Sequence, residues 1–108
     1  MQVLRSGSVY VQNRYAGQIR ETEEGYEFQY DPAYLKAEPL AVSLTLPLQE
    51  EAYRSKVLFP FFDGLIPEGW LLERAVQNWK LQPSDRFGLL LRVCKDSIGD
   101  VRIEAQKL

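Results

Sequence analysis

Residues 57–70 read VLFPFFDGLIPEGW and place an apolar, aromatic segment near the middle of a chain of 108 residues. Gly64 predicts the end of a short helix, which Ser55 can cap if Pro60 lies in or near the first turn. Pro67 predicts the start of a second helix, because proline already has the backbone geometry of a first helical turn. The stretch is therefore predicted to be the junction of two helices.

Two helical patterns lie on the C-terminal side of this junction. After Pro67, apolar residues recur at spacings of three and four, which predicts a helix lying on a sheet with Trp79 in the core. Residues 83–85 resemble the cap of a third helix, from Arg86 to about Val93. The apolar residues available for burial on these helices are Leu71, Leu72, Ala75, Val76, Phe87, Leu90, Leu91 and Cys94.

Strand patterns dominate the N-terminal half. β-branched and aromatic residues alternate with polar ones in residues 8–12 and 15–20, as they do in the strands of a hairpin. Tyr26, Phe28 and Tyr30 then fall on one face of a third strand, with polar side chains on the other face. We expect the aromatic face of this strand to pack in the core, because alternating aromatic residues suit a buried sheet face.

Two further strands and a helical turn complete the pattern. A fourth strand is predicted at residues 40–47, where apolar side chains alternate with Ser43 and Thr45, and a last strand at residues 101–105. A helical turn is predicted at residues 33–37. Together these elements predict an α+β fold, a mostly antiparallel β-sheet of about five strands covered on one face by two or three short helices. We expect one domain, residues 1–108.

Composition and charge narrow the function classes. The net charge of −2 provides no basic field for phosphates, so direct nucleic-acid binding is not expected. Cys94 is the one cysteine of the sequence, and its apolar neighbours predict a small buried side chain. The N-terminus lacks the apolar core of a signal peptide, and no apolar run approaches the ~20 residues of a membrane span. A cytoplasmic protein without membrane contact is expected.

Catalytic chemistry has little support in this sequence. The absence of histidine removes the commonest general base and metal ligand, and one cysteine cannot build a thiolate zinc site. The glycines form neither of the common phosphate-binding patterns. Acidic residues cluster at 21–24 and 50–51, in polar turns where carboxylates are usually solvated. No catalytic residue, metal or cofactor is therefore expected, and the apolar junction points to a protein partner.

Four motifs in register carry a family resemblance. They are PLAVSLTLPL at 39–48, FFDGLIPE at 61–68, DRFGLL at 85–90 and KDSIGDV at 95–101. In this order and spacing the sequence resembles the N-terminal subdomain of HipA-type serine/threonine kinases, the toxins of bacterial toxin–antitoxin modules. A stand-alone copy of this subdomain is similar to HipS-type antitoxins, the small third component of tripartite HipBST modules.

The resemblance implies a function and leaves an alternative open. It implies a non-catalytic antitoxin that binds and inhibits a HipA-like kinase toxin (HipT), with a HipB-like helix-turn-helix DNA-binding protein as a further candidate partner in the same complex. The alternative is a structural or activating subunit, or a detached N-terminal subdomain, of a HipA-like kinase. The fused kinases of the family are active although they contain the same subdomain.

Trp70 is the main candidate for the partner surface. On a helical wheel, at about 100° per residue, it falls opposite the apolar stripe that ends at Trp79. One interpretation is that Trp70 folds back over Phe61 or Phe62 and closes the junction. The other is that it is an interface anchor, a common role for tryptophan. The residues predicted to bind the partner are Trp70, Asp63, Glu68, Glu73 and Phe62, whereas Arg86 is predicted to be ordinary surface charge.

Overall fold

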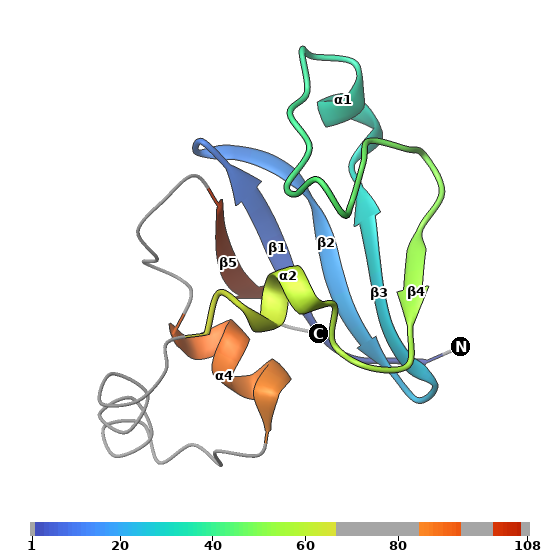
Figure 1. Cartoon of the computed structure of the whole chain (residues 1–108), viewed down its shortest axis with the longest axis vertical. Coiled ribbons are helices and arrows are strands. Elements are labelled where there is room, and N and C mark those ends of the chain that lie inside the picture. Colours follow the sequence, from blue (N-terminus) through green and yellow to red (C-terminus); the bar gives the residue numbers. More distant parts are fainter. Residues whose placement is uncertain (1, 67–84, 94–100, 107–108) are drawn as a thin grey trace.

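A computed structural model describes residues 2–66, 85–93 and 101–106 (Figure 1). Its strands are β1 (Val3–Val11), β2 (Arg14–Thr22), β3 (Gly25–Tyr30), β4 (Tyr53–Ser55) and β5 (Val101–Gln106). Its helices are α1 (Pro32–Leu35), α2 (Pro60–Asp63) and α4 (Arg86–Val93). In these ranges no helix is long and apolar enough to cross a membrane.

The strands form one antiparallel sheet in the order β4-β3-β2-β1-β5. The last strand returns to pair with the first, from Ser6 opposite Gln106 to Val11 opposite Val101. A five-stranded antiparallel sheet with short helices confirms the predicted fold class. The hairpin between β1 and β2 turns on Gln12 and Asn13, whose φ angles of 50° and 65° suit the twist of a two-residue turn.

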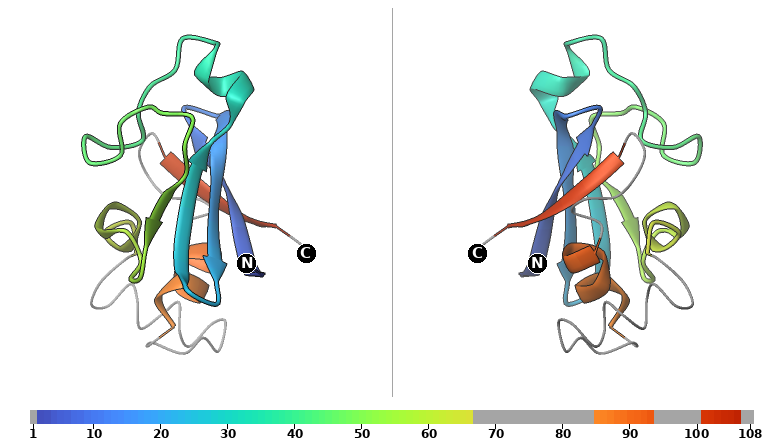
Figure 2. Two further views of the ribbon diagram at one scale, coloured as in Figure 1. Left: turned by 90° about the vertical axis from the view of Figure 1, so that its right-hand side faces the viewer. Right: turned by 90° about the vertical axis from the view of Figure 1, so that its left-hand side faces the viewer.

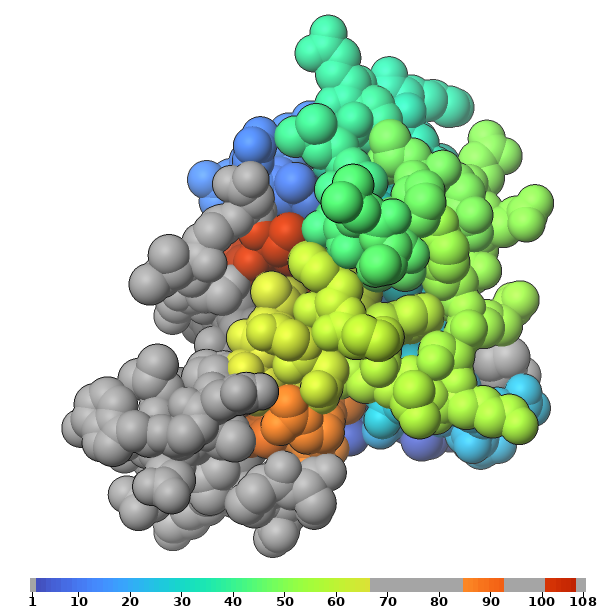
Figure 3. All heavy atoms as spheres, viewed as in Figure 1, coloured from blue at the N-terminus to red at the C-terminus, as the bar shows by residue number. Residues whose placement is uncertain are grey.

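One face of the sheet, called the core face below, carries the apolar side chains. Val9 lies opposite Ile103, and Ile19 lies opposite Phe28, so all four share this face. Phe28 and Tyr30 are fully buried and Tyr26 is partly buried, which confirms the expected aromatic core. Figures 2 and 3 show α2 and the segment between α1 and β4 lying over this face.

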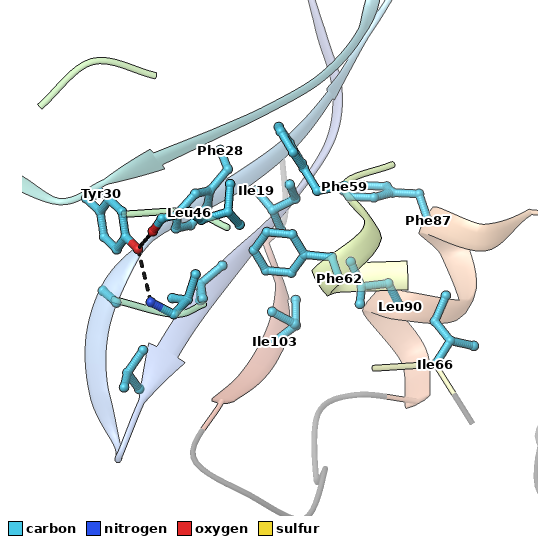
Figure 4. Packing of buried hydrophobic residues seen from close by; sticks show 14 of the residues in the cluster. Ile19, Phe28, Tyr30, Leu46, Phe59, Phe62, Ile66, Phe87, Leu90 and Ile103 are labelled. Atoms are coloured by element: carbon cyan, nitrogen blue, oxygen red, sulfur yellow. Dashed lines mark hydrogen bonds between the residues drawn. The ribbon is translucent and has the colours of Figure 1, made fainter. Parts of the chain in front are cut away.

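Aromatic side chains from the helices complete the core (Figure 4). The Phe62 ring of α2 packs on Phe28 with the ring centroids 5.3 Å apart. The Phe87 ring of α4 lies 5.6 Å from that of Tyr26. Other buried members of the cluster are Val9, Val11, Ala16, Ile19, Tyr30, Tyr34, Val42, Leu46, Phe59, Ile66, Leu89, Leu90 and Ile103.

The opposite face of the sheet, called the polar face below, carries a hydrogen-bonded network. Gln18 Nε2 donates to Gln106 Oε1 at 2.7 Å, and Gln106 Nε2 donates to Ser8 Oγ at 2.7 Å. Arg20 donates to Gln18 Oε1 at 3.2 Å and to Gln29 Oε1 at 3.1 Å. The network thus joins β5, β1, β2 and β3 through side chains as well as through the backbone.

The prediction of a fourth strand at residues 40–47 is wrong. The segment makes one isolated bridge, between Ser43 and Leu46, and is otherwise a loop. The buried Tyr30 hydroxyl accepts a hydrogen bond from Val42 N at 3.0 Å and donates to Leu46 O, so it takes up backbone groups that a strand would pair. The fourth strand is instead Tyr53–Ser55, which pairs with β3 and has too few residues to show an alternating pattern.

The helix predictions are partly confirmed. α2 ends at Gly64 as expected, but it begins at Pro60, so Ser55 does not cap it. Ser55 Oγ instead accepts a hydrogen bond from Val57 N at 3.2 Å. The helix predicted from Arg86 to about Val93 is confirmed as α4. The helix predicted after Pro67, and with it Trp79, lies outside the described residues, as does Cys94.

Candidate functional site

The aromatic residues of α2 differ in their burial. Phe62 is 0% exposed, whereas Phe61 is partly buried and packs edge-on against Phe62 with ring centroids 5.2 Å apart. Phe59 is buried too, and it packs on Phe62 from the N-cap position of the helix. One aromatic ring on α2, that of Phe61, therefore extends towards the surface, as expected of three aromatic residues crowded around so short a helix.

Asp63, at the end of α2, is held by an ion pair from α4. Arg86 Nε lies 2.7 Å from Asp63 Oδ1, and Arg86 Nη2 lies 3.4 Å from the Asp63 carbonyl oxygen. The side chains remain 43% exposed for Asp63 and 34% exposed for Arg86. Arg86 is thus more than the ordinary surface charge predicted from the sequence. It fixes the position of α2 on α4 and leaves part of the Asp63 carboxylate open to solvent.

The start of α4 is fixed by a second charged cluster. Asp85 Oδ1 accepts a hydrogen bond from Gly88 N at 3.1 Å, which caps the helix. Arg5, on β1, donates to both Asp85 oxygens at 2.8 and 2.9 Å and to both Glu21 oxygens at 2.7 and 2.9 Å. The Arg5 guanidinium lowers the pKa of Asp85 below its ordinary value. This cluster ties α4 to β1 and β2.

Gly88 leaves room for that cluster. A Cβ added at Gly88 would lie 2.9 Å from Asp85 Cγ and 3.0 Å from Arg5 Nη1, too close for either group to stay in place. Glycine at this position therefore lets the Asp85 carboxylate fold back onto the first turn of α4. Each residue of the segment 85–88 has a structural role. Asp85 caps α4, and Arg86 forms an ion pair with Asp63. Phe87 is buried in the core, and Gly88 leaves space for the Asp85 carboxylate.

The structure places two of the five predicted partner-binding residues. Asp63 lies at the surface of the junction, whereas Phe62 lies inside the core. Phe62 therefore offers no exposed surface to a partner in this structure. The other predicted residues, Trp70, Glu68 and Glu73, lie outside the described residues.

The acidic side chains that the structure places at this site are paired with arginines and not gathered into a metal-binding group. No group of three or more histidine, cysteine, aspartate or glutamate side chains that could hold a metal ion occurs within residues 2–66, 85–93 and 101–106. Asp63, Asp85 and Glu21 are each neutralised by an arginine. These ion pairs fix the positions of the three carboxylates relative to the sheet and the helices.

The arginines of this site were not recognisable from the sequence. Arg86 lies 23 residues from Asp63, and Arg5 lies 80 residues from Asp85. Pairs so far apart leave no spacing pattern in one sequence, unlike neighbours on a helix. The signal that did exist was local, because Asp85 before an apolar helix predicts a cap.

Comparison with known proteins places this geometry in a family. Residues 7–104 match the family model described as the HipA N-terminal domain. The fold is similar to a solved structure described as the N-terminal domain of HipA toxin, with a TM-score of 0.76 and 28% sequence identity. That similarity covers 99% of this chain and 97% of the solved chain.

Two relatives differ in how much of their length is matched. An uncharacterized protein of Haemophilus influenzae is 33% identical over 105 residues, which cover 97% of this chain and 96% of the relative. "Putative kinase Y4mE" of Sinorhizobium fredii is 31% identical over 98 residues, which cover 89% of this chain but only 23% of Y4mE. The same domain therefore makes up nearly all of one protein and a minor part of another.

Proposed function

The chain belongs to the HipA N-terminal domain family, and from this premise we propose that it is an antitoxin. It binds a HipA-like serine/threonine kinase toxin and inhibits it, without catalytic activity of its own. Its counterpart among known systems is then HipS, and its target is a kinase of the HipT type. It acts in the cytoplasm, where a HipB-like DNA-binding protein is a further candidate member of the complex.

The main support is the contrast between the two relatives. The Haemophilus influenzae protein consists almost entirely of this domain, whereas Y4mE contains it within a much longer chain. A domain that occurs both inside a longer chain and as a separate protein has a surface suited to the remainder of that longer chain. When separate, it can bind such a surface in trans, and inhibition follows if it covers the active site or restrains a moving element.

The proposed contact surface is the junction of α2 and α4. Asp63 presents a partly exposed carboxylate there, fixed in place by Arg86. Trp70, flanked by Glu68 and Glu73, is proposed to enter a cleft of the kinase from the chain that follows α2. Tryptophan is over-represented among residues whose truncation weakens binding by about 2 kcal/mol or more.

The second candidate is a subunit that supports a kinase. Y4mE favours it, because a protein with a kinase name carries this domain in its own chain. On this alternative the protein completes or activates the kinase fold, or is its detached N-terminal subdomain. The two functions differ in the sign of their effect on kinase activity.

Co-expression tests the sign and the contact together. The cognate HipA-like kinase is expressed in bacteria with and without this protein, and growth is followed alongside a pull-down. Rescue of growth with a stable complex is the result expected of an antitoxin. Binding without rescue would favour the supporting subunit, and absence of binding would overturn both candidates.

A pair of variants separates direct contact from support of the fold. Asp63→Ala and Arg86→Ala both remove the ion pair between α2 and α4, but only Asp63→Ala removes the carboxylate offered to the partner. A direct contact predicts that Asp63→Ala weakens kinase binding clearly more than Arg86→Ala does. Equal losses of affinity in the two variants would mean that Asp63 only holds α2 in place on α4. Trp70→Ala, checked for an unchanged fold, is expected to weaken binding most.

A further inference from the structure

The segment called the leucine loop, residues 40–48, exposes apolar side chains. Leu44 is 99% exposed, and Leu40 and Leu48 are 48% and 38% exposed. Scattered apolar residues are normal on a protein surface. A nearly fully exposed leucine between two partly exposed ones requires an explanation if the loop is rigidly held in that conformation.

Two buried tyrosine hydroxyls hold the leucine loop. Tyr34 Oη donates to Leu40 O at 2.6 Å and accepts from Leu40 N at 2.9 Å. Tyr30 Oη accepts from Val42 N at 3.0 Å and donates to Leu46 O. Burial raises the pKa of Tyr30 to about 12, so its hydroxyl remains a donor at neutral pH. The backbone on both sides of Leu44 is thus fixed to the core.

The tip of the leucine loop is a tight turn that directs Leu44 outwards. Ser43 Oγ accepts from Thr45 N at 3.1 Å and lies 2.9 Å from Thr45 Oγ1, while Leu46 N donates to Ser43 O at 3.1 Å. Val42 and Leu46 are buried on either side. Because the turn is already ordered, binding through Leu44 loses little conformational entropy.

The leucine loop lies on the same side of the sheet as the junction of α2 and α4 (Figure 2). In Figure 3 the green atoms of this part of the chain lie beside the yellow atoms of α2. Leu46 of the loop and Phe62 of α2 also belong to one buried cluster. One partner can therefore contact both features at once.

We propose that the leucine loop is a second docking element, whose Leu44 enters an apolar hollow on the body of a HipA-like kinase. The proposal rests on the proposed function and adds a contact outside the junction of α2 and α4. Only 23% of Y4mE is matched, so most of that chain lies beyond this domain. A domain is expected to contact the rest of the chain that contains it, and this protein would make the same contact in trans. A preordered leucine that is 99% exposed is suited to such a contact.

Two other occupants differ in how well they suit the leucine loop. A second copy of this chain is an alternative occupant, because one pocket on the described surface, of about 270 Å³, has an exposed lining that is mainly apolar; the oligomeric state measured in the test below decides between the two. An anionic membrane is disfavoured because exposed Glu38, Glu50 and Glu51 flank the loop. The residues that line the pocket are Thr22, Glu24, Gly25, Tyr26, Glu27, Arg54, Ser55 and Lys56.

The test compares two leucine-to-alanine variants for affinity to the purified cognate kinase. Leu44→Ala is expected to raise Kd about tenfold or more, as loss of a buried leucine at an interface does. Leu4→Ala, at an exposed leucine on β1, is the matched control and is expected to bind like wild type. Neither change touches the core, so the melting temperatures should stay close to that of wild type.

The outcomes separate this proposal from the proposed function. If wild type binds and inhibits the kinase but Leu44→Ala binds equally well, the docking role of the leucine loop is overturned and the antitoxin function stands. If wild type does not bind the kinase, both fail. If the free protein is a dimer that Leu44→Ala dissociates while kinase affinity is unchanged, the occupant is a second copy and the proposal is wrong.

Discussion

The two faces of the sheet are stabilised by different means. On the core face, aromatic rings of β3 pack against rings from α2 and α4, with close contacts such as Phe28 on Phe62. On the polar face, side-chain amides, hydroxyls and Arg20 bond to one another across four strands. Loss of side-chain volume on the core face should therefore lower the free energy of unfolding strongly. Loss of a hydrogen bond on the polar face should lower it less, because water can replace the lost partner.

The largest expected effect is that of Phe62→Ala on the core face. Phe62 is fully buried beneath α2, so truncation leaves a cavity and should lower the free energy of unfolding by about 3–5 kcal/mol. Phe61→Ala is the control on the same helix. Its ring is partly exposed, and the expected loss is about 1–2 kcal/mol. Urea unfolding measures both, and equal losses would contradict the assignment of Phe62 to the core.

Gly88→Ala should come second, because it disturbs the charged cluster at the rim of the core face. The added methyl group would displace the Asp85 carboxylate from Gly88 N and from Arg5, with an expected loss of about 1–3 kcal/mol in stability. Gly64→Ala is the control, since Gly64 ends α2 with ordinary helical angles, φ −68° and ψ −15°. Its expected change is within about 0.5 kcal/mol. Thermal unfolding of both variants checks the difference, and a harmless Gly88→Ala would refute it.

On the polar face, Gln106→Ala should have a smaller effect. It removes an amide that accepts from Gln18 and Ser6 and donates to Ser8, for an expected loss of about 0.5–1.5 kcal/mol. Arg54→Ala, at the exposed edge of the same face, removes a surface ion pair with Glu27 and should change stability by less than about 0.5 kcal/mol. A loss for Gln106→Ala as large as that for Phe62→Ala would remove the distinction between the faces.

The smallest effect concerns pH. The folded-state pKa of Asp85 is lowered, chiefly by hydrogen bonds from Arg5, so its stabilisation is complete above the unfolded pKa and is lost as pH falls through the folded pKa. Asp85→Asn should destabilise the protein by about 0.5 kcal/mol at pH 7, because the pair is partly exposed. That difference from wild type should shrink in acid, below about pH 4. Urea unfolding at neutral and acidic pH measures it, and a difference that grew in acid would be inconsistent with this sign.

The parts of the fold that could be predicted from the sequence depend on neighbouring residues. Alternating residues predict β3 and β5, and Gly64 predicts the end of α2. A capping residue and the spacing of apolar residues predict α4. Residues 40–47 alternate in the same way but form a loop. The deciding contact there is the Tyr30 hydroxyl, which is distant in sequence and has no local signature.

The candidate site shows the same limit. The apolar junction in the sequence predicts Asp63 at its surface, and the Asp63 side chain is 43% exposed there. The same junction predicts Phe62 at the partner surface, but Phe62 is buried, because the sheet supplies Phe28 beneath it. Neither Arg86 nor the outward direction of Leu44 could be predicted, since both depend on contacts between segments that are far apart in the chain.

The pairing of β1 with β5 determines when this sheet can be completed during synthesis. Ser6 and Gln106, which are paired in the sheet and hydrogen-bonded through their side chains, lie 100 residues apart. The β1–β2 hairpin can form early on the ribosome, but one edge of β1 stays open until β5 has been made. Contacts between distant residues slow folding, and an open edge can pair with other chains. The β1 side of the sheet is therefore closed only once β5 has been made.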